Sequence, residues 1–413
     1  MIRIDLGPLG RFKCPVSLKA KKLSNYKTYL FEKSIKKTSS VKNIKRVHLV
    51  YPVGNKVSTP DTIGFHLQIE LEKHYQVTTY NYDEIKLIKP GNSDVLIGHW
   101  HPNPLTVFRM SAKKKGWKRV LGLAPFCPDS TGWQNAFGNN IIKNCDRYLA
   151  ITGNYWINRL NDSPFQHWEP KTVHLDLAVD RRNFPFIKKN FNSAGKRRFI
   201  YIGHSAWYKN TSFLEKIAQK LPHIDFAWIG GNSSLKDIKR LGKYDFSNQE
   251  AKNLIQEYDF LITVGSADGN PTTILEAMAW GLIPVCSVQS GYEGFSGIQN
   301  ISIDLIGDAV AAIEKLQSVS EVQLKKWQQE NLDCLDRHFN WERFCSQVLD
   351  EIESKYSPGL AETSFSNRLS LLVAELKSPN FWGRPINIYH FLKANLKYAF
   401  QKNVAENITA RIG

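Results

Sequence analysis

The chain has 413 residues, which is enough for two domains with complete hydrophobic cores. Hydrophobic residues make up 42% and charged residues 23%, proportions that are ordinary for a soluble globular protein. Lysine and arginine number 55 against 38 acidic residues, and the resulting net charge of +17 favours polyanions such as nucleic acid, anionic lipid or nucleotide phosphates without choosing among them.

Cysteine usage and hydropathy indicate a cytoplasmic protein. The six cysteines form no C-x-x-C pair and no metal-type spacing, which is typical of reduced thiols in a cytosol. The longest apolar segment, residues 277–288, is about twelve residues long and too short to span a bilayer. A peripheral position on the inner face of the membrane stays open as an alternative.

Residues 1–45 read as a basic N-terminal extension, rich in lysine and serine. A solvated tail is the simplest interpretation, and steering toward a membrane or substrate is the alternative. A first domain follows over residues 46–190.

Strands and helices alternate in that first domain. Apolar runs predict buried strands at residues 46–51, 77–80, 94–97, 119–123 and 148–151. A polar loop over residues 52–64 is expected to precede an amphipathic helix carrying Phe65, Leu67, Ile69 and Leu71. The alternation predicts a doubly wound parallel sheet whose ligand edge is formed by the loops after the strands, including the loop with Gly54.

Two histidines follow the third of these strands, in the sequence Gly98-His99-Trp100-His101-Pro102. A histidine at a strand end is often structural, but two within three residues at the expected ligand edge also suit a site. A neutral imidazole there can donate or accept one hydrogen bond with a polar ligand. The sequence does not choose between His99 and His101.

The second domain begins after a segment of linker-like composition, residues 190–198. Residues 198–203 predict a strand, followed by a turn with Lys209 and a helix with Leu214, Ile217, Ala218 and Leu221 on one face. Residues 225–230 predict the next strand. Ser247, with Glu250 three residues on, is expected to open another helix just after Tyr244.

The most informative stretch is residues 258–288. Apolar strands at 260–264 and 283–288 flank a small polar loop, residues 265–271, and a short helix that Thr273 and Glu276 are expected to open as a capping box. A helix N-terminus at the carboxyl end of a parallel strand suits an anion. Asp268 and Glu276 bracket it and suit the hydroxyls of a sugar and a ribose.

The segment SADGNPTTILEAMAWGLIPVCS resembles the donor-binding signature of family 4 retaining glycosyltransferases of the GT-B fold, an E-x7-E pattern in which Asp268 replaces the first glutamate. The resemblance implies an α/β fold of two Rossmann-like doubly wound domains facing a cleft, with C-terminal helices crossing back to the first. It further implies a nucleotide-diphosphate sugar as co-substrate, no cofactor and no metal ion.

The resemblance also assigns residues. His99, Lys209 and Asp268 take catalytic positions, and His99, His101 and Gly54 lie on the acceptor side or by the sugar. Lys209, six residues after Gly203, matches the lysine that holds the donor diphosphate, whereas His204 stands where the family has arginine. The residues implied to bind the donor are Gly203, His204, Lys209, Tyr244, Asp268, Gly269, Asn270, Pro271, Thr272, Thr273 and Glu276.

Further matches occur in family order. Asp94 and His99 keep a D-x4-H spacing, and residues 179–185 resemble the family's interdomain segment. Residues 339–342 match its terminal F-x-W-E pattern, whose helix crosses back to the first domain. The second domain is therefore placed at residues 191–338, with a crossing helix and helical extension at 339–413. Residues 358–413 either pack on the first domain or grip anionic lipid.

We expect a retaining glycosyltransferase of the hexosyl type that uses a UDP-, GDP- or dTDP-linked sugar and a saccharide or lipid-linked acceptor. Bacterial polysaccharide or glycan biosynthesis is the expected context. The alternatives are a sugar-nucleotide epimerase on the same fold and a non-catalytic protein that binds polyanions or membrane surfaces. Nucleic-acid binding is the weakest reading, because no recognition motif accompanies the charge.

Overall fold

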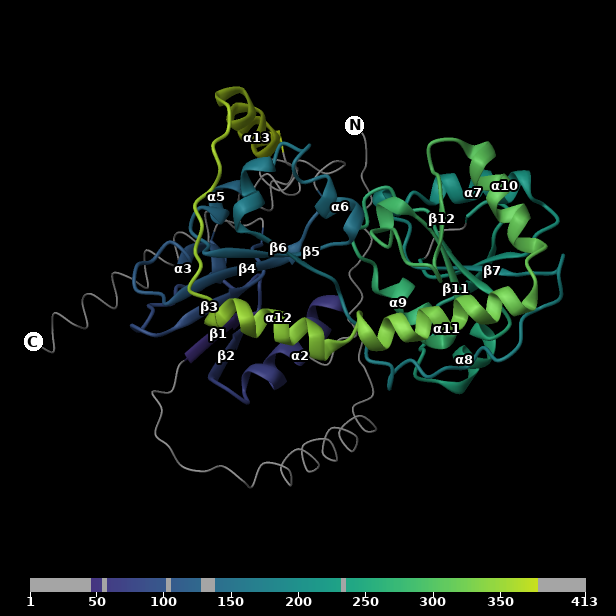
Figure 1. Cartoon of the computed structure of the whole chain (residues 1–413), viewed down its shortest axis with the longest axis horizontal. Helices are drawn as coiled ribbons and strands as arrows, with labels where there is room; N and C mark the ends of the chain where they lie inside the picture. Colours follow the sequence, from purple (N-terminus) through teal and green to yellow (C-terminus); the bar gives the residue numbers. More distant parts are fainter. Residues whose placement is uncertain (1–45, 54–57, 102–104, 128–137, 232–234, 378–413) are drawn as a thin grey trace, which may run out of the picture. The chain divides into compact units, whose positions relative to one another are not determined.

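The computed structural model describes residues 46–53, 58–101, 105–127, 138–231 and 235–377. It contains two parallel six-stranded sheets, in the orders β2-β1-β3-β4-β5-β6 and β12-β11-β10-β7-β8-β9 (Figure 1). The expected α/β fold of two doubly wound sheets is confirmed. The N-terminal extension, Gly54 and residues 378–413 lie outside the described residues.

The first sheet contains the five predicted strands and one that was not predicted. Its strands are β1 (Arg46–Val50), β2 (Gln76–Tyr80), β3 (Val95–Gly98), β4 (Arg119–Pro125), β5 (Arg147–Ile151) and β6 (Thr172–Leu175). The edge strand β6 was missed because only Leu175 of its four residues is buried, so its sequence lacks the apolar run of a central strand.

Short helices accompany this sheet: α2 (Thr59–Leu71), α3 (Val107–Ser111), α5 (Asn139–Ile142), α6 (Asn154–Asn158) and the 3-10 turn η1 (Gln166–Lys171). The predicted loop over residues 52–64 is wrong, since α2 starts at Thr59. Ser58 caps it by accepting a hydrogen bond from the amide of Asp61. The helix buries Ile63, Leu67 and Leu71 rather than the full predicted set.

The second sheet has an apolar centre and polar edges. Its strands are β7 (Phe199–Ile202), β8 (Phe226–Ile229), β9 (Lys239–Gly242), β10 (Phe260–Thr263), β11 (Ile283–Ser287) and β12 (Gln299–Ile301). The four central strands match predicted runs. The edge strands β9 and β12 were not predicted, because an edge strand needs little burial and these two carry lysine, arginine, glutamine and asparagine.

The helices of the second half are η2 (Trp207–Lys209), α7 (Thr211–Lys220), α8 (Gln249–Ile255), α9 (Thr272–Trp280), η3 (Val288–Ser290), α10 (Ile306–Gln317) and α11 (Glu321–Arg337). Ser247 does not open α8 as predicted. The Ser247 amide donates to the Asp245 carboxylate in a turn, and Asn248 precedes the helix. Ser247 and Asn248 are adjacent polar residues, and Ser247 belongs to the turn before the helix.

The linker predicted at residues 190–198 is anchored to the second sheet. Asn192 donates hydrogen bonds from its amide and side chain to the Asp259 carboxylate, each at 2.8 Å, and Lys188 Nζ lies 3.0 Å from the same group. Phe191 is buried beside them. Small polar residues here serve to satisfy a buried carboxylate rather than to supply flexibility.

The helix α12 (Trp341–Glu353) returns to the first sheet, as the resemblance implied. It lies beside α2 (Figure 1), and the Trp341 ring stacks on His66 with centroids 4.2 Å apart. Phe344, Val348 and Ile352 are buried in the core shared with β1. Helix α12 therefore helps to cover the N-terminal sheet.

Part of the C-terminal extension packs on the first half. The amide of Ala361 donates to the His167 carbonyl, and Leu371 of α13 (Phe365–Lys377) is buried. This supports packing for the described residues up to 377 and leaves the membrane interpretation of the remainder as a prediction. No helix within the described ranges has both the length and the apolar character needed to cross a bilayer.

Candidate donor site

The loop after β10 and the start of α9 form the centre of the predicted site. The capping box predicted from Thr273 and Glu276 is wrong, because α9 begins at Thr272 and Pro271 precedes it with no side-chain cap. The N-terminus of α9 therefore has backbone amides that no side chain caps, which is the local requirement for binding an anion.

Lys209 and Asp268 are brought together by this loop. Their side chains form an ion pair, and each is only about one seventh exposed, at 13% and 15%. The amide of Ser266 donates to the Tyr208 carbonyl at 2.9 Å and holds the Lys209 turn against the loop. The structure thus places the predicted diphosphate-binding lysine beside the predicted sugar-binding acid.

Gly269 is required by close packing. A Cβ at this position would lie 2.7 Å from Cys127 Sγ and 3.1 Å from the Phe126 carbonyl oxygen, both at the end of β4. The sequence predicted a close approach by the loop backbone. What it approaches here is the carboxyl end of a strand of the first sheet.

His204 does not replace the family's arginine as a second cation. Its Nδ1 accepts a hydrogen bond from the Ala206 amide, and its Nε2 bonds the Tyr208 hydroxyl. Burial and the nearby Lys209 charge lower the pKa of His204, with Asp268 opposing them. The imidazole is neutral at pH 7, which leaves Lys209 as the cation of this turn.

Glu276 and Asn270 sit on opposite sides of the helix start. Burial raises the pKa of Glu276 to about 7, although a hydrogen bond with Thr272 opposes the rise. Asn270 Oδ1 accepts the Leu177 amide at 2.7 Å, and its Nδ2 is buried without a partner among the described residues. The carboxamide oxygen is thus used within the protein, whereas the NH2 group has no hydrogen-bond partner among the described residues.

Tyr244 lies away from this loop. It lines a hollow of about 400 Å³ formed by residues 241–251, which shares no residue with the loop at 265–271. The sheet order places β9 three strands from β10, about 14 Å across the sheet. The predicted nucleobase contact of Tyr244 therefore stays a prediction.

His99 and His101 both border one tyrosine after β2. The Tyr82 ring centroid is 5.2 Å from that of His99 and 5.7 Å from that of His101. Burial lowers the pKa of His99 to about 4, and His99 Nδ1 is buried with no partner in the described part of the chain. Burial also lowers the pKa of His101, with Asp83 opposing it. Both imidazoles are neutral near pH 7.

Asp94, the first residue of the D-x4-H spacing, contacts groups other than His99. Its carboxylate accepts the Gly91 amide at 2.7 Å and lies 3.3 Å from His48 Nε2. His48 Nδ1 in turn contacts the Tyr80 hydroxyl at 2.9 Å. Asp94 therefore joins β1, β2 and the start of β3 below the site.

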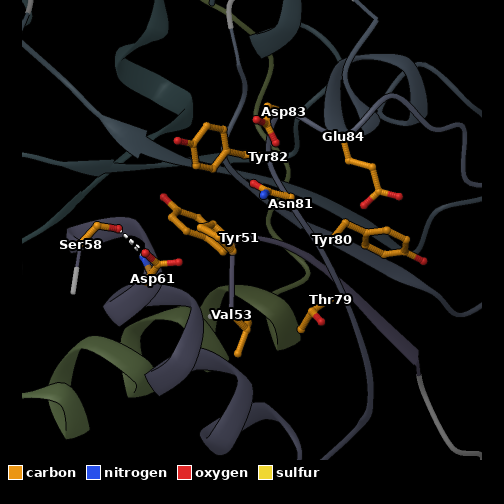
Figure 2. Close-up of a pocket in the computed structure, with 11 residues that line it drawn as sticks. Tyr51, Val53, Ser58, Asp61, Thr79, Tyr80, Asn81, Tyr82, Asp83 and Glu84 are labelled. Atoms are coloured by element: carbon orange, nitrogen blue, oxygen red, sulfur yellow. Dashed lines mark hydrogen bonds between the residues drawn. The ribbon is translucent and has the colours of Figure 1, made fainter. Parts of the chain in front are cut away.

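A second hollow opens at the carboxyl ends of β1 and β2 (Figure 2). It has a volume of about 600 Å³, and α2 contributes Ser58 and Asp61, whose side chains are hydrogen-bonded at 2.5 Å. The remaining walls come from Tyr51, Pro52, Val53 and residues 79–84. The prediction missed this hollow, and the available signal was the run Tyr80-Asn81-Tyr82-Asp83-Glu84 directly after a strand.

Two parallel doubly wound sheets with a C-terminal helix returning to the first sheet define the GT-B fold, and solved structures agree. Sucrose-phosphate synthase from Thermosynechococcus elongatus matches with a TM-score of 0.55 at 10% identity, over 74% of this chain and 98% of its own. An alpha-glucosyltransferase solved with UDP and a 13-mer DNA containing a HMU base matches with a TM-score of 0.52 at 12% identity. The match covers 75% of this chain and 99% of that protein.

TarM matches with a TM-score of 0.50 at 14% identity, over 71% of this chain, which spans 59% of TarM. No known protein-family description matches the sequence, and no curated protein is detectably similar to it. At 10–14% identity these likenesses establish the fold. Function must be argued from the site itself.

Proposed function

We propose that this protein is a retaining glycosyltransferase, similar to family 4, that takes its sugar from a nucleotide-diphosphate donor. The observation that carries the proposal is the Lys209–Asp268 ion pair at the uncapped N-terminus of α9. One cation and a helix N-terminus suit a diphosphate, and a carboxylate beside them suits sugar hydroxyls. The alpha-glucosyltransferase with this fold has the same general activity in its name.

Donor binding would exchange the partners of the ion pair. Lys209 would turn from the Asp268 carboxylate to the diphosphate, and Asp268, with the NH2 group of Asn270, would accept and donate hydrogen bonds to the sugar. Glu276 would bond the ribose hydroxyls from the second turn of α9. After the exchange each charged group would still have an oppositely charged or polar partner.

Transition-state stabilisation would come from Lys209 and the amides at the start of α9. As the sugar–phosphate bond breaks, negative charge grows on the departing diphosphate, and pre-positioned donors stabilise it more than they stabilise the intact donor. The acceptor hydroxyl would attack from the same face, and the departing phosphate oxygen would take its proton. We propose that no metal ion takes part in this step.

The acceptor is proposed to be a saccharide or a lipid-linked saccharide, in a cytoplasmic pathway that builds a bacterial polysaccharide or glycan. His99 and His101 are proposed to lie by the donor sugar or the acceptor. As neutral imidazoles they would donate or accept one hydrogen bond each rather than carry charge.

The test is a thermal-shift titration of the full chain with UDP, GDP, dTDP and their common sugar conjugates, in the presence of EDTA. One nucleotide should raise Tm in a dose-dependent way. A cooperative melt with no shift from any nucleotide would overturn the proposal. If a nucleotide sugar is consumed with release of free nucleotide although no acceptor is present, the protein is an epimerase of the same fold instead.

A further inference from the structure

We propose that the hollow at the ends of β1 and β2 receives the acceptor as a saccharide that carries no phosphate or carboxylate at its bound end. This inference rests on the proposed function, and it names the chemical class of the second substrate. Three features of the hollow support it: the position along the sheet edge, the aromatic walls and the acidic charge.

The hollow lies on the same edge as the donor loop. The loop touches this sheet at the end of β4, where Gly269 packs on Phe126 and Cys127. The sheet order then places β3, with His99 at its end, between that contact and the hollow over β1 and β2. Donor loop, His99 and hollow therefore follow one another along one edge.

His99 also contacts the walls of the hollow directly. Its ring lies edge-on to Tyr51, with centroids 6.0 Å apart, and 5.2 Å from Tyr82. Both tyrosines line the hollow. A saccharide bound there would lie next to His99, whose Nδ1 is buried and has no hydrogen-bond partner in the described part of the chain.

The size and walls of the hollow suit a sugar. Its volume of about 600 Å³ falls within the usual range for small-ligand sites. Tyrosine rings offer an apolar face for the C–H side of a sugar ring and a hydroxyl at the rim. Asn81, Thr79 and Ser58 add neutral polar groups around them.

The charged groups of the hollow are mainly acidic. Asp61 is 5% exposed and accepts the Ser58 hydroxyl, and Asp83 and Glu84 stand on the opposite wall. Among the described residues neither aspartate forms an ion pair. Glu84 has Lys86 at 3.9 Å, but both side chains are about half exposed, so that pair is weak.

Carboxylates select against anionic ligands. An ionised carboxylate only accepts hydrogen bonds, so it suits hydroxyl or ammonium donors and repels a phosphate or a uronate. This selection opposes the chain's overall charge of +17, which draws polyanions to its surface at large. Residues 54–57, between Val53 and Ser58, lie outside the described residues and are not part of the proposed site.

The test compares three sugar trimers of equal length by isothermal titration calorimetry with the full chain, with and without the nucleotide found by thermal shift. The trimers are of N-acetylglucosamine, glucosamine and galacturonic acid. The neutral or the cationic trimer should bind at least about tenfold more tightly than the uronate trimer. Equal or tighter binding of the uronate overturns the inference.

Variants locate the binding. D83N/E84Q should reduce the ratio of affinities between the neutral and the uronate trimer about threefold or more, since both carboxylates are removed. These side chains lie at an exposed wall, so the substitutions should not disturb folding. D304N removes an exposed carboxylate on the second half and should leave the preference unchanged. An unchanged preference in D83N/E84Q places the selection elsewhere and overturns the inference.

The two proposals fail separately. If the protein binds a nucleotide but no trimer, whether or not the nucleotide is present, the acceptor inference is overturned and the donor proposal stands. Trimer binding with the expected order but no nucleotide binding supports the hollow as a saccharide site and overturns glycosyl transfer.

Discussion

The two ligand edges of the molecule differ in strand order and in the charged groups that they present. The second sheet presents Lys209 and the N-terminus of α9, whereas the first presents Asp61, Asp83 and Glu84 with two neutral histidines. Both sheets have six parallel strands, although in different orders, and the charged groups that set the two edges apart lie in the loops after the strands and at helix starts. We propose that these edges hold an anionic donor on one side and a non-anionic acceptor on the other.

Of the substitutions that test this difference between the two edges, removal of Lys209, the cation of the second edge, should have the largest effect on activity. Lys209→Ala should reduce turnover by about two powers of ten or more, because the departing diphosphate loses its charged partner. The measurement is the steady-state rate with the identified nucleotide sugar.

Lys216→Ala, on the exposed face of α7, is the matched control and should keep full activity. Turnover of Lys209→Ala close to the unmodified protein would remove this lysine from the site. The double variant with Asp268→Asn separates the loss of the cation from the cost of an unpaired carboxylate.

The next largest effect is expected at the boundary between the two edges. His99→Ala should lower kcat/KM about tenfold or more, because a buried imidazole with an unused nitrogen is positioned to bond the substrate. His101→Ala should cost less. Since the pKa of His99 is lowered to about 4, its titration should add no inflection to the rate profile between pH 5.5 and 7.5.

Replacing Asp268 by glutamate, which the resembled glycosyltransferases have at this position, tests whether the length of this acid helps to choose the donor sugar. Asp268→Glu keeps the charge that pairs with Lys209 but moves the carboxylate by one methylene, so the ratio of kcat/KM between two donor sugars should change about tenfold. Parallel assays with gluco- and galacto-configured donors measure that ratio. An unchanged ratio would show that Asp268 serves the ion pair and does not choose the sugar.

The smallest effect concerns Glu276 and depends on pH. Its pKa of about 7 in the fold exceeds the usual 4.5, so the folded state holds the extra proton between these values and stability falls as pH rises through that window. Glu276→Gln should remove this loss, so the effect of the substitution on the free energy of unfolding should be about 3 kcal/mol more favourable at pH 8 than at pH 4.

The same substitution should weaken nucleotide binding several-fold at pH 8, where the carboxylate is ionised, and less at pH 6. Urea unfolding and nucleotide titrations at the three pH values measure both trends. A nucleotide affinity that Glu276→Gln leaves unchanged at pH 8 would exclude contact with the ribose.

The central strands could be predicted because burial on both faces demands continuous apolar runs such as those of β7 and β10. The edge strands β6, β9 and β12 could not, since their sequences are as polar as loops. The pairing of Lys209 with Asp268 was predictable only through the resemblance, because the two residues are 59 positions apart. The partner of Asp94 could not be predicted, since spacing along a strand end does not reveal that His48, on the neighbouring β1, contacts its carboxylate.

The return of α12 to the first sheet has a consequence for synthesis on the ribosome. The six strands of that sheet are complete at Leu175, yet Phe344, Val348 and Ile352, which share the core of β1, emerge much later. At ordinary translation rates the delay is on the order of ten seconds or more. During that interval the side of α2 that α12 covers stays exposed, so the nascent N-terminal half should be a client for chaperones until α12 arrives.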